Sequence, residues 1–160
     1  MKLVLQRVLA GKVIVGGEEI SSIGKGLVVF AGIRKDDTEE DAEYLAAKTA
    51  NLRVFDDADG RMNLNLEQAG GAILSIPQFT LFGRLNRGNR PSFDEAAPGE
   101  NASLLWNEFN RKLRSRGIEV REGVFGAHMI IEMTHDGPVT LMLESAAKNP
   151  CGQQNPPAAE

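Results

Sequence analysis

A Gly137-Pro138 dipeptide lies between two apolar, strand-like runs, residues 128–133 and 139–143. Proline holds φ at about −65° and has no backbone N–H, whereas glycine adopts backbone conformations that other residues avoid. The dipeptide therefore predicts a rigid turn between two strands, with carbonyl groups that point in set directions. Taken alone, an ordinary hairpin turn is the simpler interpretation.

A second stretch, residues 75–81, places small polar side chains and an aromatic ring at the end of another apolar run. Pro77 interrupts this run. Because proline cannot donate to a β-ladder, we expect an edge, a bulge or a strand end that faces a cavity. The backbone N–H groups of Gln78, Phe79 and Thr80 would then be free to meet a ligand. We expect the two stretches to form one site.

The length of 160 residues, with 42% apolar and 25% charged residues, is typical of one globular domain. The N-terminus, residues 1–7, has only a short apolar run interrupted by charge, which argues against a signal peptide. No apolar run approaches the roughly 18 residues of a membrane helix. The single cysteine, Cys151, leaves no partner for an internal disulfide and no cysteine-based metal site. The sequence thus predicts a cytoplasmic protein that has no membrane contact.

The apolar patterns predict an α+β fold in a single domain over residues 1–144. Its sheet is expected to be mostly antiparallel and barrel-like, with two main helices packed on it. Thr38 is placed to cap the first helix, which has a buried apolar stripe, and the second helix runs from about Asn101 to Gly117. Residues 145–160 are expected to be a disordered tail. The expected strands are residues 2–8, 12–15, 18–23, 27–33, 52–55, 72–79, 119–122, 128–133 and 139–143.

Three arginines, Arg84, Arg87 and Arg90, lie in a loop rich in glycine and asparagine. The formal net charge of −4 does not favour general nucleic-acid affinity, which normally needs a basic face. Any contact with nucleic acid must therefore be local, and this loop is the candidate for binding phosphates. A solvated loop is the alternative interpretation.

Familiar hydrolase motifs are absent from the sequence. His128 and His135 are the only candidates for a neutral-pH base, and strand alternation places residues seven apart on opposite faces. Thr80 could act as a nucleophile only with a base that the nearby sequence does not supply. The acidic turn at residues 56–60 lacks suitable ligands at both ends of a calcium loop, so no metal site is predicted.

Hydrolysis of an already activated ester, such as an aminoacyl-RNA linkage, requires fewer catalytic groups from the protein. Positioning contributes about 7–11 kcal/mol to lowering a barrier, and one oxyanion donor about 2.7–4 kcal/mol. An enzyme that holds such an ester beside backbone N–H groups can lack a catalytic triad. Two other hypotheses remain open: a threonine-nucleophile hydrolase of another small ester or amide, and a module that binds tRNA ends without turnover.

The two stretches together resemble the signature pair of the D-aminoacyl-tRNA deacylases, formerly called D-tyrosyl-tRNA deacylases. The resemblance extends from Met1 to about Glu144, and the order and spacing of its pieces make it specific. These pieces are residues 5–8, 62–65, 68–71, 78–81, 87–93, 125–127 and 136–140. The resemblance implies a homodimer, free of metal and cofactor, that hydrolyses the ester between a D-amino acid and the 3′-terminal adenosine of tRNA.

The resemblance also implies a role for Gly137-Pro138. In that family the dipeptide is cis and reaches from one subunit into the active site of the other. Its carbonyls hold the substrate α-amino group and leave no room for an L side chain, so that chirality is tested by rejection. Glycine passes this test, and such enzymes also clear glycine from mischarged alanine tRNA.

The other site residues follow from the same resemblance. Phe79 contributes its backbone N–H, Thr80 lies near the ester and Gln78 shapes the catalytic segment, while the RNA 2′-hydroxyl assists the reaction. Met129 and Phe125 line the adenosine pocket, although a core role explains each equally well.

Two residues depart from the family pattern. Pro77 stands where the family usually has serine, and His135 where it usually has asparagine. A Pro-Gln pair is typical of a sister group with relaxed chirality, whose Gly-Pro is trans and which removes L-alanine from mischarged threonine tRNA. Phe79 and residues 136–140 favour the strictly D-specific group.

Overall fold

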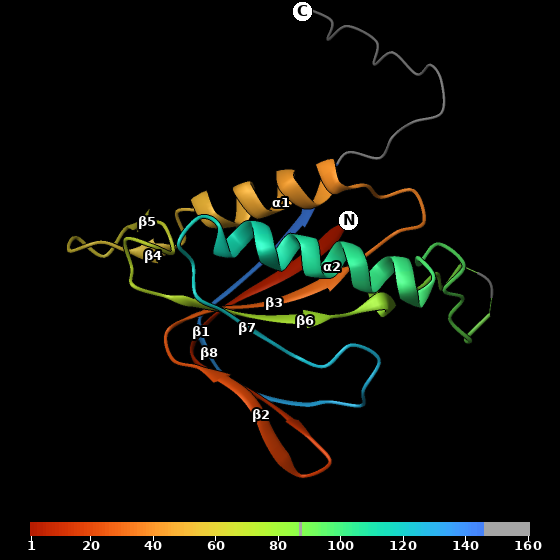
Figure 1. Ribbon diagram of the computed structural model, residues 1–160. Helices are drawn as coiled ribbons and strands as arrows, with labels where there is room; N and C mark the ends of the chain where they lie inside the picture. The colour runs from red at the N-terminus through yellow and green to blue at the C-terminus, as the bar shows by residue number, and fades with distance from the viewer. Residues whose placement is uncertain (87, 146–160) are drawn as a thin grey trace, which may run out of the picture.

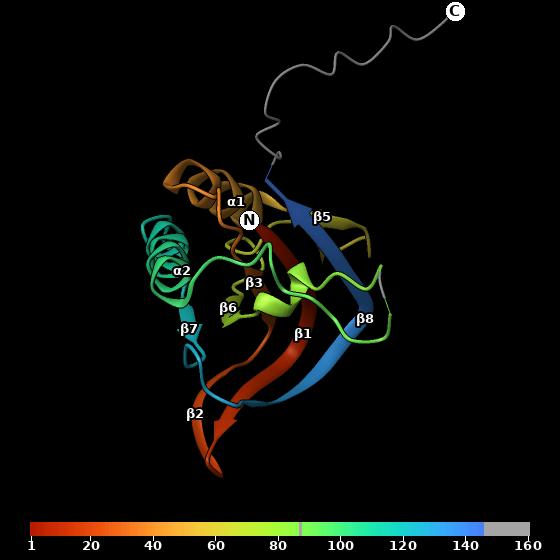
Figure 2. The ribbon, with the colours of Figure 1, turned by 90° about the vertical axis from the view of Figure 1, so that its right-hand side faces the viewer.

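The computed structural model describes residues 1–86 and 88–145. Arg87 and the tail at 146–160, which the sequence predicted to be disordered, lie outside the described residues. The chain forms a mixed sheet that is nearly barrel-shaped, covered on one face by two helices (Figures 1 and 2). The elements are β1 (Lys2–Val15), β2 (Glu18–Ile23), β3 (Gly26–Gly32), α1 (Glu39–Asn51), β4 (Phe55–Asp56), β5 (Met62–Leu64), β6 (Ala72–Pro77), the 3-10 helix η1 (Phe79–Phe82), α2 (Gly99–Arg114), β7 (Val120–Glu122) and β8 (Ile130–Glu144).

The main sheet has the strand order β2-β1-β3-β6-β7, and β8 pairs with β1. β1 is antiparallel to β2, β3 and β8, whereas β3–β6 and β6–β7 are parallel pairs. The pieces expected at 2–8 and 12–15 are therefore one strand. It pairs with β3 through residues 2–8 and with β2 through residues 11–15, while β8 follows it along the other edge.

β8 is continuous through Gly137-Pro138, so the predicted turn between two strands was wrong. Its pairing with β1 jumps from Gln6 opposite Thr140 to Val8 opposite His135. Residues 136–139 therefore form a wide bulge opposite Arg7. A proline has no N–H to donate to the ladder, and a bulge accommodates it because β1 supplies partners on either side.

The fold has two separate buried clusters, one on each face of the sheet. The larger one lies between the sheet and the two helices and includes Leu5, Leu45 and Phe109. The smaller one lies on the other face, where Val8, Val28 and neighbouring strand residues pack together. Residues after β7 and at the start of β8 cover this second cluster, so the sheet has buried side chains on both of its faces.

The first helix begins where the sequence predicted it. Thr38 is the N-cap, and its backbone N–H donates to the Asp41 carboxylate at 2.8 Å, which forms a capping box. The second helix begins at Gly99, two residues before the predicted start, and Gly117 follows it with φ +78°.

The strand expected at 52–55 is reduced to β4, which pairs with β5, a strand that the sequence analysis missed. In the described part of the chain, no helix is long and apolar enough to cross a membrane.

Candidate active site

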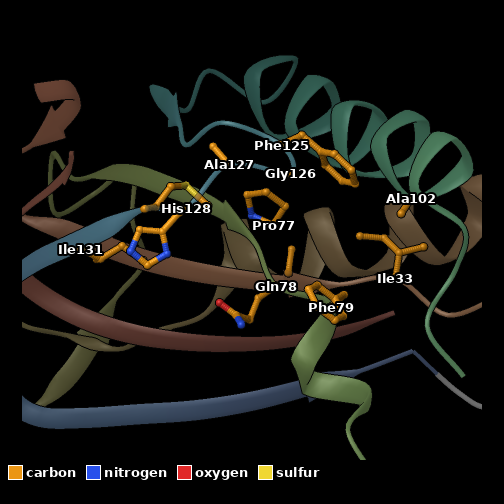
Figure 3. A pocket seen from close by; sticks show the side chains of 12 residues that line it. Ile33, Pro77, Gln78, Phe79, Ala102, Phe125, Gly126, Ala127, His128 and Ile131 are labelled. Carbon is orange, nitrogen blue, oxygen red and sulfur yellow. The ribbon is translucent and has the colours of Figure 1, made fainter. Parts of the chain in front are cut away.

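A cavity of about 250 Å³ opens beside the end of β6 (Figure 3). Its walls come from the ends of β3 and β6, from the starts of η1 and α2, and from the segment between β7 and β8. The lining residues are Ala31, Ile33, Pro77, Gln78, Phe79, Ala102, Phe125, Gly126, Ala127, His128, Met129 and Ile131. This set is mainly apolar, which is typical of pockets for small ligands.

Pro77 ends β6, two residues before the expected end of this strand, and lines the cavity, which is one of the three placements that its missing N–H predicted. The Gln78 N–H is not free, however, because it donates to the Ala31 carbonyl at 2.8 Å and continues the β3–β6 pairing for one more residue. The chain then turns into η1. The N–H groups of Phe79 and Thr80, the first in that helix, donate to no acceptor within the described residues. A helix start leaves such donors unpaired, so these two can serve a ligand.

The side chains of this segment are held by local contacts. The Gln78 amide nitrogen donates to the Thr80 hydroxyl oxygen. Phe79 is 56% exposed as a residue, and its ring packs edge-on against Phe93, with ring centroids 5.0 Å apart. Phe93 directly follows the arginine loop, so the loop and the segment with the free N–H groups are in contact.

Met129 and Phe125 form the opposite wall, as Figure 3 shows for Phe125 on the side of α2. The Met129 sulfur accepts the Val124 N–H at 3.4 Å. A Cβ atom at Gly123 would lie 2.8 Å from this sulfur, so a larger residue there would displace the Met129 side chain. His128 lines the same cavity.

Gly137-Pro138 is absent from the cavity lining, so the two stretches do not form one site within a single chain. The peptide bond between them is cis, and Gly137 has φ +116°. His135, which also does not line the cavity, places its Nε2 atom 3.1 Å from the Val139 carbonyl oxygen. The two histidines therefore do not share a site.

Arg7 is the residue of this region that the sequence analysis missed. Its side chain is only 7% exposed, and its Nε atom lies 2.9 Å from an Asp136 carboxylate oxygen, next to Gly137. The guanidinium also donates to the Val54 carbonyl at 2.7 Å and pairs with Asp56 at 3.3 Å. A charged residue within the apolar run at 2–8 was the available signal, because a buried charge needs partners.

Of the three loop arginines, the structure describes Arg84 and Arg90. The two ends of the loop pair through backbone hydrogen bonds between Arg84 and Ser92, of 2.8 and 3.0 Å. The Arg84 guanidinium forms an ion pair with Glu95. Arg90 and Arg84 line a second pocket together with Asn86, Ser92 and Asp94. The loop thus presents cations at the surface, one of them partly neutralised.

The chemistry of the cavity is set by its few polar groups. Its lining residues offer the Gln78 amide, the His128 imidazole and main-chain groups, with no carboxylate among them. In residues 1–86 and 88–145, no cluster of three or more histidine, cysteine or acidic side chains could hold a metal ion. Free backbone N–H groups beside an apolar cavity can stabilise an oxyanion.

These features define a class of protein: a single α+β domain whose mainly apolar cavity is suited to a small ligand and has main-chain donors beside it. The chain belongs to the D-Tyr-tRNA(Tyr) deacylase family, whose model matches residues 4–144. A D-aminoacyl-tRNA deacylase of Thermus aquaticus is 51% identical over 148 residues, which cover 92% of this chain and 97% of that protein. Another, from Bacillus velezensis, is 49% identical over 145 residues, covering 91% and 99%.

Two solved structures share the fold. A c-Myc DNA unwinding element binding protein superposes with a TM-score of 0.86 at 42% identity, over 92% of this chain and all of that one. A probable eukaryotic D-amino acid tRNA deacylase gives a TM-score of 0.80 at 18% identity, over 90% and 98%. The second likeness concerns the fold alone.

Proposed function

We propose that this protein hydrolyses the ester between a D-amino acid and the 3′-terminal adenosine of tRNA. The observation that carries the proposal is the pair of free N–H groups, on Phe79 and Thr80, beside a cavity without a carboxylate. Such a site suits an ester that is already activated and has little use for an acid–base pair. Membership of the deacylase family supports the same substrate class.

In this proposal the cavity takes the adenosine, against Met129 and Phe125, and the ester carbonyl lies at the Phe79 N–H. Water, activated by the RNA 2′-hydroxyl, attacks the carbonyl carbon. The bond from that carbon to the ribose 3′-oxygen breaks, and the 3′-oxygen takes up a proton. Thr80 and Gln78 shape the segment, and their side-chain hydrogen bond supports this role.

Chirality is tested, in the same proposal, by Gly137-Pro138 of a second subunit. The dipeptide does not line the cavity of its own chain, which fits such an arrangement because a partner would have to supply it. β8 carries exposed apolar side chains, Ile130, Leu141 and Met142, the last of them 76% exposed. Among the described strands, β8 pairs only with β1. Its apolar surface supports a homodimer whose contact includes this strand.

The arginine loop is proposed to contact tRNA phosphates through Arg84, Arg87 and Arg90. The packing of Phe93 on Phe79 places the loop next to the proposed ester site. A substrate that binds both would bring its terminal adenosine to the cavity and its backbone to the loop. The enzyme would act in the cytoplasm, where aminoacyl-tRNA is used.

Release of the amino acid from D-Tyr-tRNA, L-Tyr-tRNA and glycine on alanine tRNA, with a chelator present, tests this function. We expect loss of the D and glycine esters and survival of the L ester. The second candidate function is that of the sister group with relaxed chirality. Pro77 and Gln78 line the cavity and form the Pro-Gln pair that is typical of that group. Rapid hydrolysis of L-alanine from threonine tRNA would favour that group. Binding of tRNA without any turnover would favour the non-catalytic module instead.

A further inference from the structure

We infer that Ser75 and Trp106 form a buried positioning pair that holds two walls of the cavity in register and thereby sets substrate affinity. Neither side chain lines the cavity. The inference rests on the proposed function for its substrate, but the contacts that carry it are independent of which ester is cleaved.

The pair is joined by one hydrogen bond in the protein interior. The Trp106 indole N–H donates to the Ser75 hydroxyl oxygen at 2.9 Å. The two residues are 3% and 0% exposed, so water cannot replace either partner. A buried indole N–H normally has an acceptor, and its loss leaves an unpaired donor in the core.

Ser75 holds the first wall through its place in β6. It lies two residues before Pro77, where the strand ends at the cavity, and three before Gln78. Its carbonyl also accepts the Gly123 N–H at 2.9 Å, where the chain leaves β7. A single residue thus fixes the end of β6 and the start of the segment that carries Phe125 and Met129.

Trp106 holds the second wall through its ring. The indole lies 6.1 Å from the Phe125 ring, at an angle of 45°, and Phe125 lines the cavity. Met129 is tied to the same segment by the hydrogen bond from Val124. If the indole rotates, Phe125 loses its support, and the spacing between the wall at Pro77 and the wall at Phe125 changes.

The test compares Ser75→Ala, Trp106→Phe and the double variant with the wild type in steady-state deacylation of D-Tyr-tRNA. We expect Ser75→Ala to raise KM about tenfold with little change in kcat, because the walls that bind adenosine move while the donors on η1 remain. Trp106→Phe should raise KM as well. In the double variant no donor is left unpaired, so its KM should rise by less than the product of the two single effects.

Leu113→Val is the control for lost stability, since Leu113 is fully buried on the same helix but outside the cavity lining. It should lower Tm and leave KM unchanged. The sequence contains one tryptophan, so the fluorescence of Trp106 can be followed alone. Adenosine should change this emission in the wild type and require about a tenfold higher concentration in Ser75→Ala.

The outcomes separate the two proposals. A wild type that cleaves none of the esters would overturn the proposed function, and the adenosine titration would then decide the role of the pair. A KM and an adenosine affinity that stay at the wild-type values in a folded Ser75→Ala would overturn the inference. If Ser75→Ala does not fold, an unchanged KM in Trp106→Phe would overturn it equally, as would single effects on KM that multiply in the double variant.

Discussion

The Arg7 guanidinium contacts the Asp136 carboxylate, with Nε and Oδ2 2.9 Å apart, although 129 positions separate the two residues in the chain. This ion pair lies at the base of the bulge that contains Gly137-Pro138. Arg7 is buried, and its other partners are Asp56 and the Val54 carbonyl. The proposed chiral filter is therefore anchored to the middle of β1.

Replacing Arg7 by methionine should destabilise the fold and relax chirality. The loss of free energy of unfolding should be about 2–3 kcal/mol, below that of a fully buried pair, because Asp136 remains partly solvated. Released from its anchor, the bulge should admit L-aminoacyl esters. Urea denaturation and the ratio of kcat/KM for D-Tyr-tRNA to L-Tyr-tRNA measure the two effects. Asp56→Asn is the matched control, since it removes a partner of Arg7 away from the bulge and should leave the ratio unchanged.

Gly137→Ala should lower the rate of D-specific deacylation at least about a hundredfold. The new Cβ would lie 2.7 Å from the Val139 side chain and 2.9 Å from the Val139 nitrogen, and φ is +116°. The bulge must therefore move. Gly60→Ala provides the comparison, because Gly60 has φ +73° with no atom within 4 Å of the added Cβ. It should cost only about 1–2 kcal/mol of stability and retain activity. Equal activity of the two variants would contradict the role given to Gly137.

Thr80→Ala should reduce kcat by less than about tenfold, because the proposed reaction relies on the backbone N–H groups and the RNA hydroxyl. Single-turnover hydrolysis of D-Tyr-tRNA gives the rate. A loss of nearly all activity would instead indicate a threonine nucleophile. Thr80→Ser serves as the control, since it keeps the hydroxyl that accepts from Gln78.

Arg90→Ala should weaken tRNA binding and flatten its salt dependence. Each lost phosphate contact lowers the slope of log K against log salt by roughly 0.7–0.9. Arg87→Ala should act in the same way, and Arg84→Ala should change the slope less because Arg84 is already paired with Glu95. Binding titrations between low and moderate salt measure these slopes. Arg121, paired with Glu119 on the surface, offers a control whose replacement should not alter the slope.

The stabilising contribution of the Asp41 carboxylate should be lost in acid. Burial raises the pKa of this carboxyl, but hydrogen bonds from Thr38 and Ser145 and the charge of the N-terminus together outweigh burial and hold the pKa below the ordinary value of 3.8. A lowered folded-state pKa means that the carboxylate stabilises the fold above pH 3.8 and that this contribution is lost as the pH falls through the folded-state pKa. Asp41→Asn should therefore flatten the fall of Tm below about pH 4. Glu67→Gln, at an exposed position, is the control.

Local sequence patterns determined much of the framework. Thr38 and the acidic residues after it predicted the start of α1, because capping depends on neighbours within one helical turn. Gly117 marked the end of the second helix, and Pro77 marked the end of β6, because proline removes a ladder donor wherever it stands. The signature stretches also identified the family that the comparisons show.

The tertiary structure decided how these pieces meet. Gly137-Pro138 predicted a turn, yet β8 runs through it, since β1 provides a partner strand on both sides of the bulge. That register also brings Arg7 to Asp136. Likewise, Ser75 and Trp106 gave no local sign of their hydrogen bond. Residue types and short spacings set local conformation, whereas contacts between distant residues depend on strand register and packing, which only the whole folded chain defines.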